Sequence, residues 1–205
     1  MLIVIGILLF FYLLIKYSSS KANLKLKKEK DAFWLKEYQA NSTRKSDISN
    51  LDYITVPMDS LPFAETEEDE LKSIQNSIKN LSLQPILNLT GLSNTDLKLK
   101  YGVGNIAFLI QCDNNYTLLI QNIYKWGAYL YEHNNLNEAV LVLEFGIKCR
   151  TDISKNYIIL AELYQNMNVP EKIEDLIQAS EGLNTLSRET ILTALKEIKI
   201  SYYLI

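Results

Sequence analysis

The chain has 205 residues and a formal net charge of −3, and hydrophobic residues make up 48% of it, which suits a chain with one helical or mixed core. One histidine and two cysteines exclude the common zinc patterns. We therefore expect no metal and no cofactor.

An apolar run opens the chain. Residues 2–15 are almost wholly apolar, and Lys16 follows them. A membrane-spanning helix needs roughly 17 to 25 apolar residues, so the run is short, but Tyr17 and a snorkelling Lys16 extend it. No Lys or Arg precedes it, as one would in a cleaved secretory signal. We therefore expect residues 1–17 to form an uncleaved transmembrane anchor.

A basic juxtamembrane segment is expected over residues 18–49. Residues 16–45 carry nine Lys and Arg against three acids, a charge of +6, which leaves −9 for the rest of the chain. The positive-inside rule places this side in the cytoplasm and the N-terminus outside, so we expect a single-pass protein of the cell membrane. The lysines act either as this topology signal alone or also as ligands for anionic lipid headgroups. The acidic remainder argues against a nucleic-acid partner.

Within this segment, residues 31–41 predict a short amphipathic helix, because Phe33, Trp34, Leu35 and Tyr38 recur at helical spacing. An extended, proline-containing linker is expected over residues 50–67. The linker is either a solvated spacer or an apolar cover that lies along the helical domain. Its five large apolar side chains are unusual for a solvated tether.

Two helices are expected next. Acidic residues open a helix from about Glu68 to Leu81, where they complement the helix dipole. Ser93 or Asn94 caps a second helix that we expect to continue to about Gln111. Gly102 and Gly104 lack the third glycine and the preceding strand of a nucleotide fingerprint, so they indicate a kink or close helix packing.

One helical hairpin pattern then appears twice, in residues 120–153 and again in residues 154–187. The small residues Gly127 and Ala161 align, and so do bulky apolar residues on either side of them. The aligned pairs are Trp126 with Leu160, Leu130 with Tyr164, Ala139 with Ile173, and Leu143 with Ile177. A fixed period of this length is typical of stacked helix-turn-helix arrays.

This pattern resembles the tetratricopeptide repeat family. The small residues fall where that family requires two helices to approach closely. The chain departs from the family at Ile173, which replaces a small residue, and at Thr151 and Thr185, which replace the final proline. The resemblance implies a divergent pair of repeats that binds a protein or peptide along the first helix of each pair. The residues on that face would be Gln121, Tyr124, Ala128, Tyr131, Lys155, Ile158, Glu162 and Gln165.

A last helix over residues 188–202 has apolar residues at helical spacing and would cap the array. We therefore expect an all-α protein, with the anchor followed by a helical domain over residues 68–205. The abundance of Asn, Ile, Lys and Tyr indicates an AT-rich bacterial genome, such as a clostridial one. No nucleophile motif or phosphate loop is present, and His133 lies in a polar turn.

The sequence thus predicts a membrane-anchored scaffold or adaptor without catalytic activity. The alternative is a structural protein whose repeats pack on their own linker or on a second copy, so a homo-oligomer is a further possible assembly. The two hypotheses differ in whether a separate protein partner exists.

Overall fold

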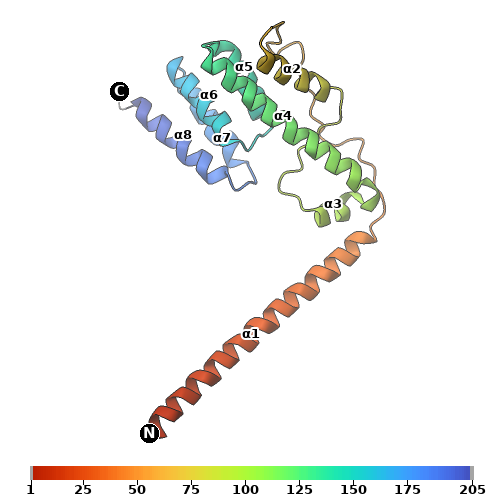
Figure 1. Cartoon of the computed structure of the whole chain (residues 1–205), viewed down its shortest axis with the longest axis vertical. Helices are drawn as coiled ribbons and strands as arrows, with labels where there is room; N and C mark the ends of the chain where they lie inside the picture. Colours follow the sequence, from red (N-terminus) through yellow and green to blue (C-terminus); the bar gives the residue numbers. More distant parts are fainter. Residues whose placement is uncertain (1, 204–205) are drawn as a thin grey trace. The chain divides into compact units, whose positions relative to one another are not determined.

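The computed structural model describes residues 2–203 and the side chains of residues 12 and 14–202. Over these residues the chain is all-helical and contains no strand, which confirms the expected fold class (Figure 1). The helices are α1 (Leu2–Asn41), α2 (Asp69–Leu81), α3 (Asn94–Tyr101), the short 3₁₀ helix η1 (Val103–Asn105), α4 (Ile106–Glu132), α5 (Leu136–Lys148), α6 (Ser154–Asn166), α7 (Glu171–Glu181) and α8 (Arg188–Tyr203).

α1 is one uninterrupted helix of 40 residues, so the short helix expected at residues 31–41 is the end of a much longer one. No Gly or Pro occurs between residues 7 and 41 to break it. In the part of the chain that the structure describes, no helix is both long and apolar enough to cross a membrane. Most of the expected anchor, residues 1–11 and 13, lies outside the residues whose side chains are described.

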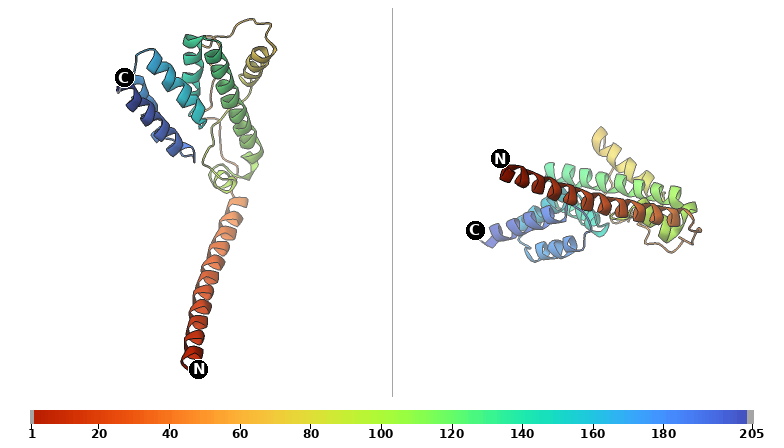
Figure 2. Two further views of the ribbon diagram at one scale, coloured as in Figure 1. Left: turned by 60° about the vertical axis from the view of Figure 1, so that its left-hand side comes forward. Right: turned by 90° about the horizontal axis from the view of Figure 1, so that it is seen from below.

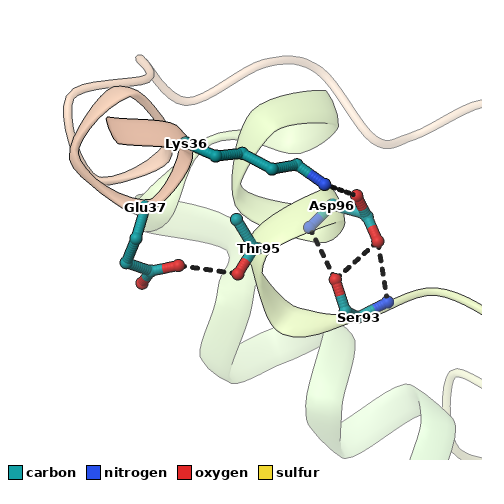
Figure 3. A network of polar contacts seen from close by, with 5 residues as sticks. All are labelled: Lys36, Glu37, Ser93, Thr95 and Asp96. Atoms are coloured by element: carbon teal, nitrogen blue, oxygen red, sulfur yellow. Dashed lines mark hydrogen bonds and ion pairs between the residues drawn. The ribbon is translucent and has the colours of Figure 1, made fainter. Parts of the chain in front are cut away.

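The chain forms two compact units. Unit 1 comprises Met1–Asp47 and Ser93–Ile106, and unit 2 comprises Ile48–Leu92 and Ala107–Ile205. In unit 1, α3 packs against the end of α1. Polar side chains join the two helices, as Figure 3 shows for Lys36 of α1 with Asp96 of α3 and for Glu37 of α1 with Thr95 of α3. Ser93 caps α3 by bonding with Asp96.

α3 is shorter than the helix expected from the sequence, because it ends at Gly102. The φ angle of this glycine is 83°, in the left-handed region that side chains with a Cβ rarely adopt. A Cβ there would also lie 2.1 Å from the carbonyl oxygen of Arg44. The backbone therefore turns at Gly102, and η1 and α4 follow as separate helices.

Unit 2 contains two helix pairs, α4 with α5 and α6 with α7, followed by α8 (Figures 1 and 2). α6 packs against α5, α7 and α8, and α8 also packs against α7. On α8, Ile191 and Leu195 are fully buried. The last helix thus covers the apolar side of the second pair.

The turns inside the two pairs have the same geometry and are related by the repeat period. Asn134 and Asn168 both adopt left-handed backbone conformations, with φ of 60° and 58°. In each turn the next residue donates its N–H to a carbonyl near the end of the preceding helix, at 2.9 Å from Asn135 to Leu130 and at 3.0 Å from Val169 to Tyr164. This bond pattern satisfies carbonyls at the end of the first helix.

Small residues allow the helices of the first pair to approach each other closely. A Cβ on Gly127 would lie 2.4 Å from Leu143 Cδ2, so α4 and α5 leave no room for a side chain there. Ala161, the aligned residue of α6, is fully buried. The sequence therefore places small residues where neighbouring side chains already fill the space.

The linker lies on the helices of unit 2. Val56 and Leu61 belong to the same apolar core as the helices, with 5% and 7% of their surface exposed. The ring of Phe63 contacts that of Trp126 at a centroid distance of 4.8 Å. The segment is therefore an apolar cover of the domain and not a solvated spacer.

Candidate interaction surface

The eight residues assigned to the partner-binding face lie on α4 and α6, four on each helix. Gln121 and Lys155 are exposed, whereas the other six are half-buried: Tyr124, Ala128, Tyr131, Ile158, Glu162 and Gln165. Half-buried side chains on packed helices are held in position by their neighbours but still offer surface. We refer to these eight residues as the α4–α6 face.

One hydrogen bond joins the two halves of the α4–α6 face. The hydroxyl of Tyr131 on α4 donates to Glu162 Oε2 on α6, at 3.3 Å. Burial raises the pKa of Tyr131, and the neighbouring Glu162 carboxylate raises it further. The phenol therefore stays protonated and remains a donor at neutral pH. The structure thus brings side chains from different helix pairs into direct contact.

The face continues toward α8. Gln165 Nε2 donates to Ser201 Oγ of α8 at 3.3 Å. Adding the repeat period once more to the α6 positions gives four residues of α8: Glu189, Leu192, Lys196 and Lys199. Of these, Lys199 forms an ion pair with Glu174 of α7 at 2.5 Å. These four residues lie beyond the second pair and were not among the eight predicted from the sequence, although they follow at the same period.

Beside the face, Glu144 connects α5 to both helices of the second pair. It accepts hydrogen bonds from the Tyr164 hydroxyl at 2.7 Å and from Lys172 Nζ at 2.9 Å. Burial raises the pKa of Glu144, but the two hydrogen bonds outweigh burial, and the pKa lies below its usual value. The carboxylate therefore stays charged and fixes the position of α6 against α5.

The side chains with catalytic potential are engaged in packing. His133 stacks on Tyr129 at 4.0 Å, and its Nδ1 lies 2.8 Å from the Tyr129 carbonyl oxygen. Both cysteines are buried free thiols, and burial raises the pKa of Cys149 to about 12. At neutral pH this thiol is not a thiolate, so it is a poor nucleophile. Within the described residues, no cluster of His, Cys, Asp and Glu is suited to a metal ion.

None of the residues of the α4–α6 face lines the cavities of about 210 and 300 Å³ in unit 2. The face combines two tyrosines and an isoleucine with charged and amide side chains. Such a mixture suits contact with another polypeptide better than enclosure of a small molecule. No family model matches the chain, and neither does a curated protein or a solved structure.

Proposed function

We propose that the protein is a membrane-anchored scaffold or adaptor, without catalytic activity of its own, that binds a protein or peptide on the α4–α6 face. The main supporting observation is the contact between Tyr131 and Glu162, which joins two rigid helices into one surface. Tyrosine supplies contact area at low conformational cost and is enriched at interfaces.

A tetratricopeptide-like architecture is part of this proposal. It is supported by the turns at Asn134 and Asn168, which recur at the repeat period with matching backbone angles. It is also supported by the close approach of Gly127 to Leu143. In that architecture the first helices of successive pairs line the ligand side, which is where the α4–α6 face lies.

The proposed location is the cell membrane, with the N-terminus outside and unit 2 in the cytoplasm. This proposal rests on the sequence, namely on the apolar run at residues 2–15 and on the lysines that follow it. The two native cysteines are poor topology probes, because Cys149 is only 4% exposed. A cysteine at Leu186, whose side chain is fully exposed, would report the side of the membrane in intact cells.

Self-association is a second candidate function, because the end of α1 exposes large apolar side chains. Phe33, Trp34, Leu35 and Tyr38 are between 55% and 75% exposed. Contiguous exposed apolar surface of this kind marks interaction sites. The linker, in contrast, contacts Trp126, which is not a residue of the α4–α6 face. Packing on the linker therefore gives no reason to discard the face as a binding surface.

The test of the main proposal is capture of crosslinked partners in cells by the full chain and by the double variant Tyr124→Ala/Tyr131→Ala. We expect the variant to lose the partner while keeping its thermal unfolding transition within a few degrees. Leu141→Ala is the matched control, because Leu141 is 47% exposed on α5 and lies outside the face. Unchanged capture by the double variant, or recovery of only the same chain, would reject the adaptor function.

A further inference from the structure

A cavity of about 210 Å³ lies in unit 2 between the turns that follow α5 and α7. These turns, residues 148–151 and 182–185, are related by the same period that relates the two helix pairs. We refer to this space as the turn cavity. Its volume is several times the roughly 30 Å³ that one water molecule occupies in the liquid, so it has room for a small molecule.

The turn cavity is bounded by chain segments that are fixed to one another. Asn88 Nδ2 donates to the carbonyl oxygen of Cys149 at 3.3 Å, which holds the segment after α2 across the end of α5. A Cβ on Gly91 would lie 2.6 Å from Asn184 Nδ2, so this segment also lies close to the turn after α7. The Ile54 N–H donates to the Ile86 carbonyl at 2.9 Å. The cavity is therefore formed by separate segments of the chain and is not a gap in one loop.

Positive charge dominates the residues that line the turn cavity. Lys148 and Arg150 contribute two cations, and Asp52 contributes the one acid. Neither cation forms an ion pair among the described residues. Thr185 also lines the cavity, and its buried Oγ1 has no hydrogen-bond partner in the part of the chain that the structure describes.

The end of a helix carries partial negative charge, which would oppose an anion in the turn cavity. Here, however, carbonyl oxygens in the last turns of α5 and α7 already accept hydrogen bonds. The N–H groups of Thr151 and Arg150 donate to Gly146 O at 3.1 Å and to Ile147 O at 2.8 Å, and the Leu183 N–H donates to Ser180 O at 3.1 Å. With these acceptors satisfied, the side-chain cations determine which ligand the cavity prefers.

Arg150 occupies an unfavourable backbone conformation, with φ of 57°. The other described non-glycine residues with positive φ are asparagines, Asn134 and Asn168, which tolerate this region well. A long cationic side chain at such a position costs stability relative to Asn or Gly, which is consistent with a role for the guanidinium. Guanidinium and ammonium groups together are the usual donors to carboxylate and phosphate oxygens.

We propose that the turn cavity binds a small oxyanion, a carboxylate or a phosphate, with Lys148 and Arg150 as charged donors. The site is separate from the α4–α6 face and does not depend on the function proposed for that face. Asp52 would limit affinity by repelling the ligand.

The test is isothermal titration of the full chain in detergent micelles with inorganic phosphate and, in a second arm, with glutarate, at constant ionic strength. We expect saturable binding of at least one probe, and the two arms distinguish phosphate from carboxylate ligands. Arg150→Asn and Lys148→Gln should each weaken binding about tenfold or more, because each removes a charged hydrogen bond. Asp52→Asn should tighten binding, because it removes a like charge.

A control lysine away from the turn cavity separates binding in the cavity from nonspecific attraction, because nonspecific attraction depends on the net charge and not on where the charge lies. Arg150→Asn places a residue that tolerates positive φ at the turn, so the fold should remain intact and thermal unfolding would verify it. Lys125→Gln, an exposed lysine of α4 away from the cavity, is the control and should change affinity less than about twofold. The proposal is overturned if neither probe binds with a dissociation constant below about 10 mM. It is also overturned if Arg150→Asn and Lys148→Gln both bind as tightly as the unaltered chain.

Discussion

The two units of the chain are each stabilised by a different kind of interaction. In unit 1, α1 and α3 are joined by partly exposed polar side chains, including the ion pairs of Lys36 with Asp96 and of Lys98 with Glu37. In unit 2, fully buried apolar side chains such as Trp126 and Leu143 form one continuous core. Exposed ion pairs contribute little stability and respond to salt and pH, whereas buried apolar area contributes most of the folding free energy. The two units should therefore respond to different perturbations.

The largest expected effect is on the core of unit 2. Trp126→Ala removes a fully buried indole and its contact with Phe63, so we expect the free energy of unfolding to fall by about 3–5 kcal/mol. Denaturant unfolding followed by circular dichroism would measure the loss.

Trp34→Ala is the matched control, because the chain has two tryptophans and Trp34 is 58% exposed on α1. Trp34→Ala should change the free energy of unfolding by no more than about 0.5 kcal/mol. Equal losses for the two variants would contradict the assignment of the core to unit 2.

A smaller effect is expected where α5 meets α6. A Cβ on Gly146 would lie 2.7 Å from Asn156 Oδ1, and Asn156 is fully buried and donates to the Leu143 carbonyl at 3.1 Å. Gly146→Ala should therefore destabilise unit 2 by about 1–3 kcal/mol, because the buried amide cannot move freely.

Gly146→Ala should instead stabilise unit 2 when Asn156 has first been changed to Ala. The clash is then absent, and alanine is about 1 kcal/mol better than glycine within a helix. A double-mutant cycle measures this coupling. If Gly146→Ala has the same effect in both backgrounds, the close contact does not determine the choice of glycine.

Acid should affect unit 1 before the core of unit 2. The hydrogen bonds from Lys36 and Ser93 lower the pKa of Asp96 from 3.8 to about 2, and those from Lys98 and Thr95 lower the pKa of Glu37. A lowered carboxyl pKa contributes stability that is present above the unfolded value and is lost as pH falls through the folded value. We expect the α1–α3 contact to weaken between about pH 4 and pH 2.

NMR detection of the α3 amides during an acid titration would measure this weakening. Lys98→Met should raise the pH at which the α3 signals change, because Glu37 loses the cation that holds its pKa down. A titration that is the same for the variant and the unaltered chain would show that this ion pair does not hold α3 on α1.

The smallest expected effect is a gain in stability at the turn after α5. Arg150→Gly relieves the left-handed backbone of Arg150, so we expect unit 2 to become more stable by about 0.5–1 kcal/mol. The midpoint temperature of thermal unfolding measures this gain. The control is Lys148→Gly, which should lower the midpoint because Lys148 occupies a helical position of α5.

Local patterns in the sequence predicted much of unit 2. The repeat period predicted α5, α6, α7 and the second half of α4, and it identified Gly127 and Ala161 as positions of close approach, because helix periodicity and residue size are local properties. It did not predict that α4 already begins at Ile106, before the first repeat. The acidic residues before Leu81 likewise predicted the start of α2. These features depend on neighbours in the sequence, so a single sequence was sufficient to find them.

Other features required the folded chain. The sequence left the role of the linker open, because only the position of Trp126 decides whether Phe63 has an apolar partner. It indicated a kink or close packing at Gly102 but continued the helix to about Gln111, because only the fold brings the backbone of Arg44 so close to Gly102 that no side chain fits there. The residues of the candidate face were inferred from the resemblance to a repeat family, which does not reveal that Tyr131 bonds to Glu162.

The sequence by itself therefore determined the all-helical class and predicted the repeat spacing, because helical periodicity is encoded in neighbouring residues. Only the tertiary structure decided that the linker covers the core, that α3 joins α1, and that Lys148, Arg150 and Thr185 line one cavity. These last arrangements depend on contacts between residues that are distant in the sequence, and no local pattern predicts such contacts.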